Sequence, residues 1–219
     1  MNEISAVAFF DIGDTLASVT LAPSGDRIAS LTAYPFVRGA LTELRQRGVR
    51  LGILSHRGPI PAQEVDRALE SAGLLELFEP DLVIYARKDS PQVFRDAAAR
   101  AGDPARVLFV GEDPGERAHA VAAGLLVAPH PLLALPVLEE QGPLRYVRIT
   151  VPTAHADADW ASALRGLPVA LLHVTGPGGR TIYATATAQA AAHLDDLGFG
   201  VDRLGAEGLP DTTVLYLLR

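Results

Sequence analysis

The sequence predicts an α/β fold built on a doubly wound, parallel, Rossmann-like sheet, followed by a smaller α+β domain with a ferredoxin-like arrangement. In the first 130 residues, short apolar runs alternate with amphipathic segments that end in glycine, a pattern typical of parallel strands joined by helices. The last part of the chain orders its expected elements as strand, helix, strand, strand, helix, strand, which is the order of a ferredoxin-like sandwich. We therefore expect domains at residues 1–130 and 144–219, joined by a proline-rich linker at 131–143.

The elements of the first domain follow from local signals. Helices are expected to end before Gly48, Gly73, Gly102 and Gly124, because glycine commonly follows the last turn of a helix. Residues 17–33 are rich in small and turn-forming residues, so we expect a loop there. The expected strands are residues 6–10, 49–54, 81–86, 106–110 and 125–128, and the expected helices are residues 37–47, 62–71, 91–101 and 115–123.

The second domain is interpreted in the same way. The Gly-Pro-Gly-Gly segment at 176–179 lies between two apolar runs and predicts a hairpin turn. No motif in this domain points to a function, and a fold alone does not assign one. The expected strands are residues 144–151, 169–175, 180–187, 199–204 and 213–218, and the expected helices are residues 157–164 and 189–197.

Composition excludes several classes of protein. No apolar run reaches 18 residues, and the chain reaches Asp11 too soon for a signal peptide, so we expect no membrane segment and a cytoplasmic location. The absence of cysteine excludes a disulfide, a thiolate zinc site and a thiol nucleophile. The formal net charge of −7 lies mostly before Leu144, and neither half is basic, which argues against nucleic acid as a bulk electrostatic partner.

Side chains suited to catalysis stand where the expected strands end. Asp11 ends the first strand within the octapeptide FFDIGDTL, Ser55 ends the second, and Glu112 and Asp113 follow the fourth. Lys88 is the only lysine among 19 basic residues. Ligands of open α/β sheets bind beyond the carboxyl ends of the strands. Taken singly, these positions have simpler explanations, as turn residues, as a solvated lysine or as acids that favour a helix N-terminus.

As an ordered set, these positions resemble the motifs of the haloacid dehalogenase superfamily. Those motifs are an Asp nucleophile after the first strand, a Ser or Thr after the second, a Lys, and an acidic pair after a later strand. The segments YPFVRGAL at 34–41 and AAGL at 122–125 often accompany them in that family. The resemblance covers about residues 4 to 130. It implies a magnesium-dependent phosphatase that acts on a phosphorylated substrate.

The resemblance implies a role for each acidic residue. Asp11 would attack phosphorus and form an aspartyl phosphate, which water then hydrolyses. Mg²⁺ prefers hard oxygen ligands and keeps several waters. Its implied ligands are Asp11, the backbone carbonyl of Gly13 and the side chain of Glu112 or Asp113, with Glu116 behind them. The family usually has Asp at the position of Glu112.

The resemblance also implies how the phosphate is bound. The hydroxyl of Ser55 and its neighbouring backbone amides would hold phosphate oxygens. Lys88 would approach both the nucleophile and the phosphate, a task that suits a compact ammonium better than a planar guanidinium. His56 stands where many relatives have Asn. Its implied role is substrate binding, and a neutral surface histidine is the simpler interpretation.

The main departure from the family pattern is Gly13, two residues after the nucleophile. Phosphatases of the family normally have a second Asp there, which protonates the leaving group and then activates water. Losing general acid–base help slows a reaction by about 10² to 10⁴. This leaves two hypotheses, a weak phosphatase and a non-catalytic binding or regulatory protein. Dehalogenation of small acids ranks last, because it needs no acidic cluster and generally relies on a cap.

The spacing of the motifs leaves no room for a large inserted cap. Only 18 residues separate Leu16 from Pro35, and one helix and one strand fill the segment from Ser55 to Lys88. In this family the cap usually closes over small substrates and excludes water. We therefore expect an open site for a larger substrate, or a lid supplied from elsewhere. The near-neutral second domain is expected to act as that lid or as a homodimer surface.

Overall fold

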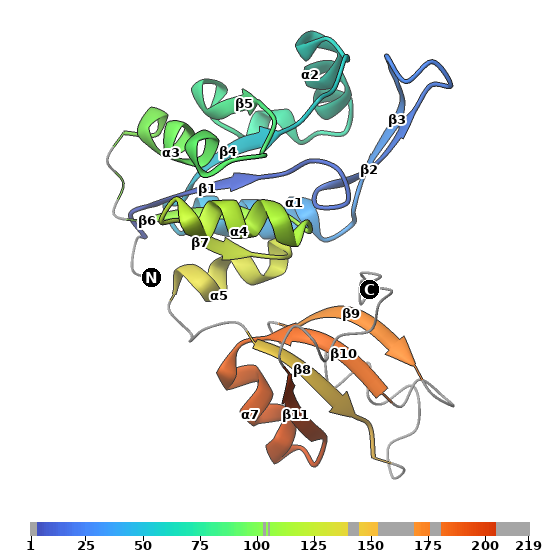
Figure 1. Ribbon diagram of the computed structural model, residues 1–219, viewed down its shortest axis with the longest axis vertical. Coiled ribbons are helices and arrows are strands. Elements are labelled where there is room, and N and C mark those ends of the chain that lie inside the picture. Colours follow the sequence, from blue (N-terminus) through green and yellow to red (C-terminus); the bar gives the residue numbers. More distant parts are fainter. Residues whose placement is uncertain are drawn as a thin grey trace. The chain divides into compact units, whose positions relative to one another are not determined.

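The computed structural model describes residues 4–102, 104, 106–139, 145–152, 169–175 and 181–204. The chain divides into two compact units, Met1–Leu138 and Glu139–Arg219, and each has its own sheet (Figure 1). Within the described ranges, no helix is both long and apolar enough to cross a membrane.

The first unit is built on the predicted parallel sheet, with strand order β5-β4-β1-β6-β7. The chain moves outward from β1 to β4 and β5, and then returns to the other side of β1 for β6 and β7. A reversal of this kind opens a crevice at the carboxyl ends of the central strands. The strands are β1 (Ala6–Phe10), β4 (Arg50–Ser55), β5 (Val83–Tyr85), β6 (Arg106–Val110) and β7 (Leu126–Ala128).

Helices and apolar side chains cover both faces of this sheet. Phe9 of β1 packs with Phe94 and Ala120 from the third and fourth helices. Phe10 points to the opposite face, where its ring meets Phe78 edge-on at 6.3 Å. Every residue of β1 is buried, as expected for a central parallel strand. The helices are α1 (Val37–Gln46), α2 (Ala62–Ser71), α3 (Pro91–Arg100) and α4 (Pro114–Ala122).

The expected loop at residues 17–33 is wrong, because this segment forms an antiparallel hairpin of β2 (Ala17–Leu21) and β3 (Ile28–Ala33). Its strands alternate small polar residues with isolated apolar ones, so the many small residues concealed a strand pattern. The turn includes Gly25 at φ 72°, a conformation that glycine adopts without strain. Figure 1 shows the hairpin extending beside α2, which contacts β3.

The predicted linker is also partly wrong. Residues Pro131–Leu133 form a 3₁₀ helix and Ala134–Leu138 form α5, and both belong to the first unit. Two prolines, Pro131 and Pro136, are buried there together with Leu133 and Leu138. Proline occurs in the first turn of a helix as well as in linkers. The many prolines in this segment therefore did not distinguish a linker from short helices. Residues 140–144 lie outside the described ranges.

His130, just before the 3₁₀ helix, is buried, and its ring centre lies 4.7 Å from that of Phe36 with the two planes tilted by 31°. Its Nδ1 accepts a hydrogen bond from the Leu132 N–H. Burial lowers the pKa of His130 to about 4 from the ordinary 6.5. The unfolded chain therefore takes up a proton below pH 6.5 that the native protein does not. Stability is lost as the pH falls from 6.5 toward 4, by up to about 3 kcal/mol.

We expect His130→Asn to remove this part of the pH dependence, because Asn keeps an acceptor for the Leu132 N–H but cannot become charged. The measurement is urea unfolding of both proteins at pH 7 and pH 4.5. The comparison cancels the contribution of the carboxyl groups, which the two proteins share. Equal losses of stability in both would contradict a neutral, buried His130.

The second unit contains a four-stranded antiparallel sheet in the order β11-β8-β10-β9. This is the strand order of the predicted ferredoxin-like arrangement. Its core includes Val147, Ile149, Ile182, Leu194 and Phe199. The expected helix at 157–164, turn at 176–179 and strand at 213–218 lie outside the described residues. The elements are β8 (Arg145–Thr150), β9 (Val169–Thr175), β10 (Thr181–Ala186), α7 (Ala188–Asp196) and β11 (Gly200–Leu204).

Candidate active site

Asp11 lies directly after β1, at the carboxyl edge of the first sheet. Its backbone N–H donates to the carbonyl of Val110 at 2.9 Å, which continues the pairing of β1 with β6. Its side chain is 12% exposed. The sheet therefore fixes the backbone of Asp11 and leaves one small opening for its carboxylate.

Lys88 is buried against this carboxylate, with only 1% of its side chain exposed. Its Nζ lies 2.7 Å from Asp11 Oδ1 and 2.7 Å from Glu116 Oε2. The ammonium also lies 5.4 Å from the centre of the Phe109 ring, within the range of a cation–π contact. One cation thus offsets the negative charge of two carboxylates at a site with little water.

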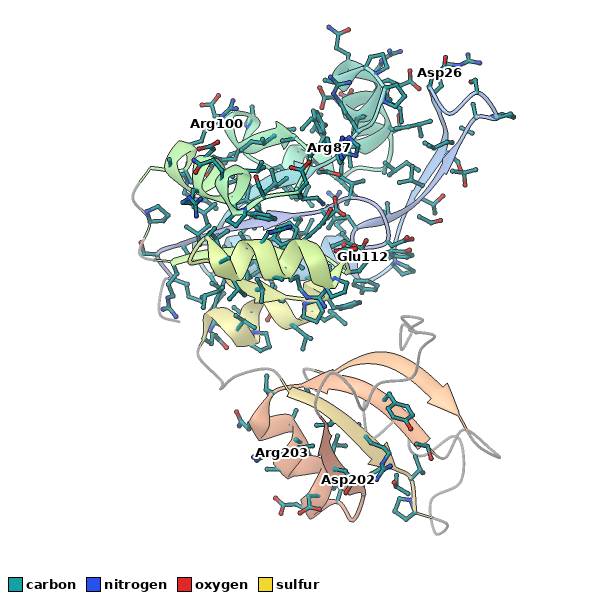
Figure 2. The ribbon with its side chains drawn as sticks, in the orientation of Figure 1. Asp26, Arg87, Arg100, Glu112, Asp202 and Arg203 are labelled. Atoms are coloured by element: carbon teal, nitrogen blue, oxygen red, sulfur yellow. The ribbon has the colours of Figure 1, made fainter. Side chains whose placement is uncertain are left out.

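Glu112 occupies the turn between β6 and α4 (Figure 2). Its Oε2 accepts a hydrogen bond from Thr15 Oγ1 at 2.6 Å, which ties this turn to the loop after β1. Burial raises the pKa of Glu112; the Thr15 hydrogen bond opposes that rise, and the charge of Asp11 adds to it. Arg117 Nη1 donates to the carbonyls of Gly111 and Glu112 at 2.7 and 2.6 Å. Glu112 is therefore held close enough to Asp11 for the two charges to interact.

Asp113 has a structural role in α4. It is the N-cap residue, its Oδ1 accepts from the Glu116 N–H at 2.8 Å, and its side chain is exposed. The cap orients the first turn of α4 so that Glu116 contacts Lys88. Burial raises the pKa of Glu116, and Lys88 opposes this rise. Of the acidic residues considered for the metal, Glu112 and Glu116 therefore interact with Asp11, whereas Asp113 caps the helix.

Gly13 has an ordinary backbone conformation. A Cβ built at this position meets no atom within 4 Å, and the positive φ in this loop belongs to Asp14, at 51°. Asp14 is exposed, and Tyr34 Oη lies 3.5 Å from its Oδ1. The site thus has space for a side chain at position 13, while Asp14 is directed toward Tyr34.

Ser55 is the last residue of β4, the neighbour of β1 on the side opposite to β6, and His56 follows it. Ser55 is buried and its carbonyl accepts from the Ala86 N–H at 3.0 Å. His56 is exposed. Both line a pocket that also includes Gly13. The structure thus brings the residues predicted from separate motifs to one edge of the sheet.

The donor set at this edge suits magnesium. Across the described part of the chain, no group of three or more His, Cys, Asp or Glu side chains is arranged to hold a metal ion. Magnesium does not need one, since it commonly binds one or two carboxylates together with waters and substrate phosphate. Asp11 and Glu112 interact electrostatically and supply hard oxygen atoms of this kind.

Sequence reasoning gave no role to Thr15 or Arg117 and only a background one to Glu116. Thr15 is 2% exposed and lies inside the octapeptide that contains Asp11. Its hydroxyl, two positions after Gly13, was the signal that could have pointed to it. Arg117 is one of 18 arginines and carried no such signal. The contact of Glu116 depends on the rotation of α4, which periodicity does not determine.

The fold is similar to several solved structures. A hydrolase of the haloacid dehalogenase superfamily from Ehrlichia chaffeensis is 12% identical, with a TM-score of 0.47, and the match covers 64% of this chain and 98% of that one. An uncharacterized protein from Listeria monocytogenes serotype 4b is 18% identical, with a TM-score of 0.48 and coverage of 56% and 76%. A D,D-heptose 1,7-bisphosphate phosphatase from B. bronchiseptica, complexed with magnesium and phosphate, is 21% identical, with a TM-score of 0.39 and coverage of 56% and 78%.

The sequence itself places the chain in a family. No curated protein sequence matches it significantly. The family model of haloacid dehalogenase-like hydrolases, however, matches residues 9–124. That match spans more than half of the chain and includes Asp11, Ser55, Lys88 and Glu112. The chain therefore belongs to the family of haloacid dehalogenase-like hydrolases.

Proposed function

We propose that this hydrolase is a magnesium-dependent phosphatase that acts through an aspartyl phosphate on Asp11. The observation that carries the proposal is the buried Lys88 ammonium, 2.7 Å from both Asp11 and Glu116. A buried cation of this kind offsets the charge of a carboxylate nucleophile and attracts a phosphate dianion to it. A purely structural Asp at the end of a strand needs no such partner.

The proposed reaction has two steps. In the first, a carboxylate oxygen of Asp11 attacks phosphorus, and the bond from phosphorus to the leaving oxygen breaks, with the electron pair going to that oxygen. In the second, water attacks the phosphorus of the aspartyl phosphate, which releases phosphate and restores the Asp11 carboxylate. The proton of that water passes to the phosphate or to solvent. Splitting the transfer in this way replaces one difficult step by two easier ones.

The protein supplies the charges around the transferred group. Lys88 offsets the negative charge of Asp11 and Glu116 from inside the fold. Asp11, the Gly13 carbonyl and Glu112 would hold magnesium, which would supply positive charge to neutralise the phosphate. Ser55, at the end of the adjacent strand β4, would donate its hydroxyl to a phosphate oxygen. These residues bind and orient the phosphate, and none of them is a general acid for the leaving group.

Position 13 supports the alternative of a non-catalytic binding protein, because it carries no acid. Under the phosphatase proposal, the same feature restricts the enzyme to substrates whose leaving groups need no proton. Aryl and acyl phosphates belong to this class, whereas alkyl phosphates do not. Turnover of an acyl or aryl phosphate therefore separates the two hypotheses.

We expect Asp11→Asn to abolish turnover of acetyl phosphate and to weaken magnesium binding, since the amide is a poor nucleophile and a neutral ligand. Activity is measured by phosphate release, and magnesium binding by calorimetry on the same samples. Asp14→Asn is the matched control, because Asp14 is the nearby exposed acid and Asn tolerates its positive φ. Full activity and unchanged magnesium affinity in Asp11→Asn would refute the proposal.

A further inference from the structure

A pocket opens beside the nucleophile, on the β4 side of β1. Its volume is about 360 Å³, and its lining includes Ile12, Gly13 and Ser55. This size lies within the range of about 300–1,000 Å³ that is common for small-molecule sites. Because Gly13 and Ser55 also border the proposed phosphate site, a substrate whose phosphate contacts Asp11 would place its remaining part in this pocket.

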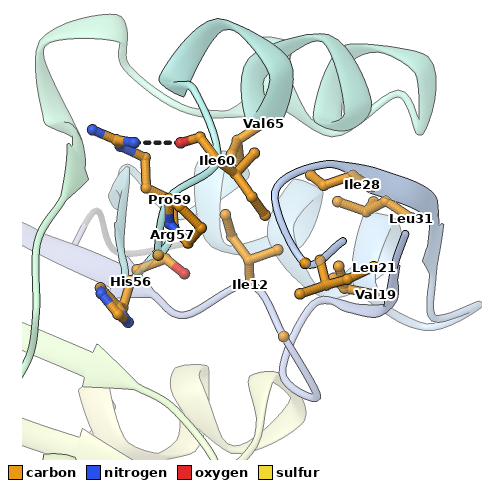
Figure 3. A pocket seen from close by; sticks show the side chains of 14 residues that line it. Ile12, Val19, Leu21, Ile28, Leu31, His56, Arg57, Pro59, Ile60 and Val65 are labelled. Atoms are coloured by element: carbon orange, nitrogen blue, oxygen red, sulfur yellow. Dashed lines mark hydrogen bonds between the residues drawn. The ribbon is translucent and has the colours of Figure 1, made fainter. Parts of the chain in front are cut away.

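The walls of the pocket are largely aliphatic. Figure 3 shows Ile12 between side chains of the β2–β3 hairpin and side chains from the segment after β4. Ile12 and Ile60 are buried, at 5% and 6% exposure, whereas the hairpin residues are partly open. The aliphatic residues on which the argument depends are Ile12, Val19, Ile28, Leu31, Ile60 and Val65.

The hairpin presents one face to this pocket. Val19 pairs with Leu31 across the two strands, and Leu21 pairs with Ile28, and all four residues line the pocket. A two-stranded hairpin is only marginally stable by itself. This one is held by Glu64 of α2, whose Oε1 accepts from the Ile28 N–H at 2.8 Å.

The other face of the hairpin is polar. Ser18, Thr20 and Thr32 are exposed and are absent from the pocket lining. Aliphatic residues on one face and polar residues on the other are expected of a hairpin that contacts an apolar group with one face. The aliphatic face of the hairpin therefore forms one wall of the pocket.

Few polar groups are available inside the pocket. Its polar side chains are those of Ser55, His56 and Arg57, and the Arg57 guanidinium donates to the Ile60 carbonyl (Figure 3). A sugar phosphate would bury hydroxyl groups against aliphatic walls, where each unpaired group is costly. An aromatic or aliphatic group would instead gain from leaving water.

We infer that the substrate is a phosphorylated compound with an apolar leaving group, and that the hairpin is the element that selects it. The inference rests on the proposed phosphatase function. It also agrees with the glycine at position 13, because an aryl group leaves as a phenolate and needs no acid there. The specificity residues are Val19, Ile28 and Leu31, which contact the leaving group and not the phosphate.

The test compares two substrates that both have good leaving groups, 1-naphthyl phosphate and acetyl phosphate. We expect Leu31→Asn to lower kcat/KM for 1-naphthyl phosphate about tenfold, since a polar amide replaces an apolar contact. The small acetyl group does not reach the hairpin, so its kcat/KM should change by less than about twofold. Unchanged acetyl phosphate turnover also shows that the variant is folded.

Thr32→Asn is the matched control, because Thr32 is the next residue on β3 but faces solvent. It should leave both substrates unaffected. Equal losses for both substrates in Leu31→Asn, or no loss for either, would overturn the inference.

Failure of the phosphatase proposal has a different signature, which is the absence of turnover of either substrate by the wild type. In that case, calorimetry with 1-naphthyl phosphate and glycerol 2-phosphate tests whether the pocket binds an apolar group. Tighter binding of the naphthyl compound that Leu31→Asn weakens about tenfold would retain the apolar site. Equal binding of the two compounds would overturn it.

Discussion

Gly13→Asp is expected to raise turnover of alkyl phosphates by about 10² to 10⁴, because it restores a general acid for leaving groups that need a proton. The structure removes the usual obstacle to such a change. The backbone of Gly13 is not left-handed, and a Cβ there meets no atom within 4 Å. Turnover of glycerol 2-phosphate, measured by phosphate release at pH 6 to 8, tests the expectation.

Gly13→Asn is the control, since it adds nearly the same volume without the acid. We expect it to leave alkyl phosphates as poor substrates and to have little effect on acetyl phosphate, whose leaving group needs no proton. If Gly13→Asp folds normally and hydrolyses neither class of substrate, the binding-protein hypothesis replaces the phosphatase.

Lys88→Met is expected to affect both stability and catalysis. It leaves Asp11 and Glu116, whose side chains are 12% and 24% exposed, without their shared cation. Removing one partner of a buried ion pair costs about 3–5 kcal/mol, and we expect the lower end because both carboxylates keep some contact with water. The loss should shrink as the pH falls toward the raised pKa of Glu116, because a protonated carboxyl group needs no cation. Turnover of acetyl phosphate should fall by about 10² to 10³.

The double variant Lys88→Met with Glu116→Gln separates these two effects. It removes one of the two stranded charges and should recover part of the stability, as measured by urea unfolding, without recovering turnover. A Lys88→Met protein as stable as the wild type, or a double variant less stable than the single one, would contradict the shared ion pair.

Much of the site could be predicted because its residues form an ordered set near the ends of the expected strands. Asp11 interrupts an apolar strand, and Lys88 is the only lysine of the chain. Both signals are local, and the parallel sheet brings such strand ends together in any doubly wound fold. The contact of Lys88 with Asp11 is therefore a consequence of topology, and topology was predictable from the alternation of elements.

The remaining features depend on packing that spacing does not specify. In the sequence, Glu116 and Asp113 are both acidic residues at a helix N-terminus. Only the structure shows that Glu116 contacts Lys88 and that Asp113 caps α4. The hairpin was missed because isolated valine and leucine residues among serine and threonine resemble a loop. The role of its aliphatic residues became apparent only from the structure, which places them along the pocket. Pro131 and Pro136 show the converse, because both are buried in helical turns despite a linker-like composition.

The most direct test of the proposed chemistry is to trap the phosphorylated enzyme. Without an acid or base at position 13, hydrolysis of the aspartyl phosphate should be slow, so the intermediate should accumulate when the wild type turns over acetyl phosphate with magnesium. After acid quenching and digestion, mass spectrometry is expected to find one phosphoryl group on the peptide that contains Asp11, and less of it in Gly13→Asp. A wild-type protein that releases phosphate while this peptide stays unmodified would contradict nucleophilic attack by Asp11.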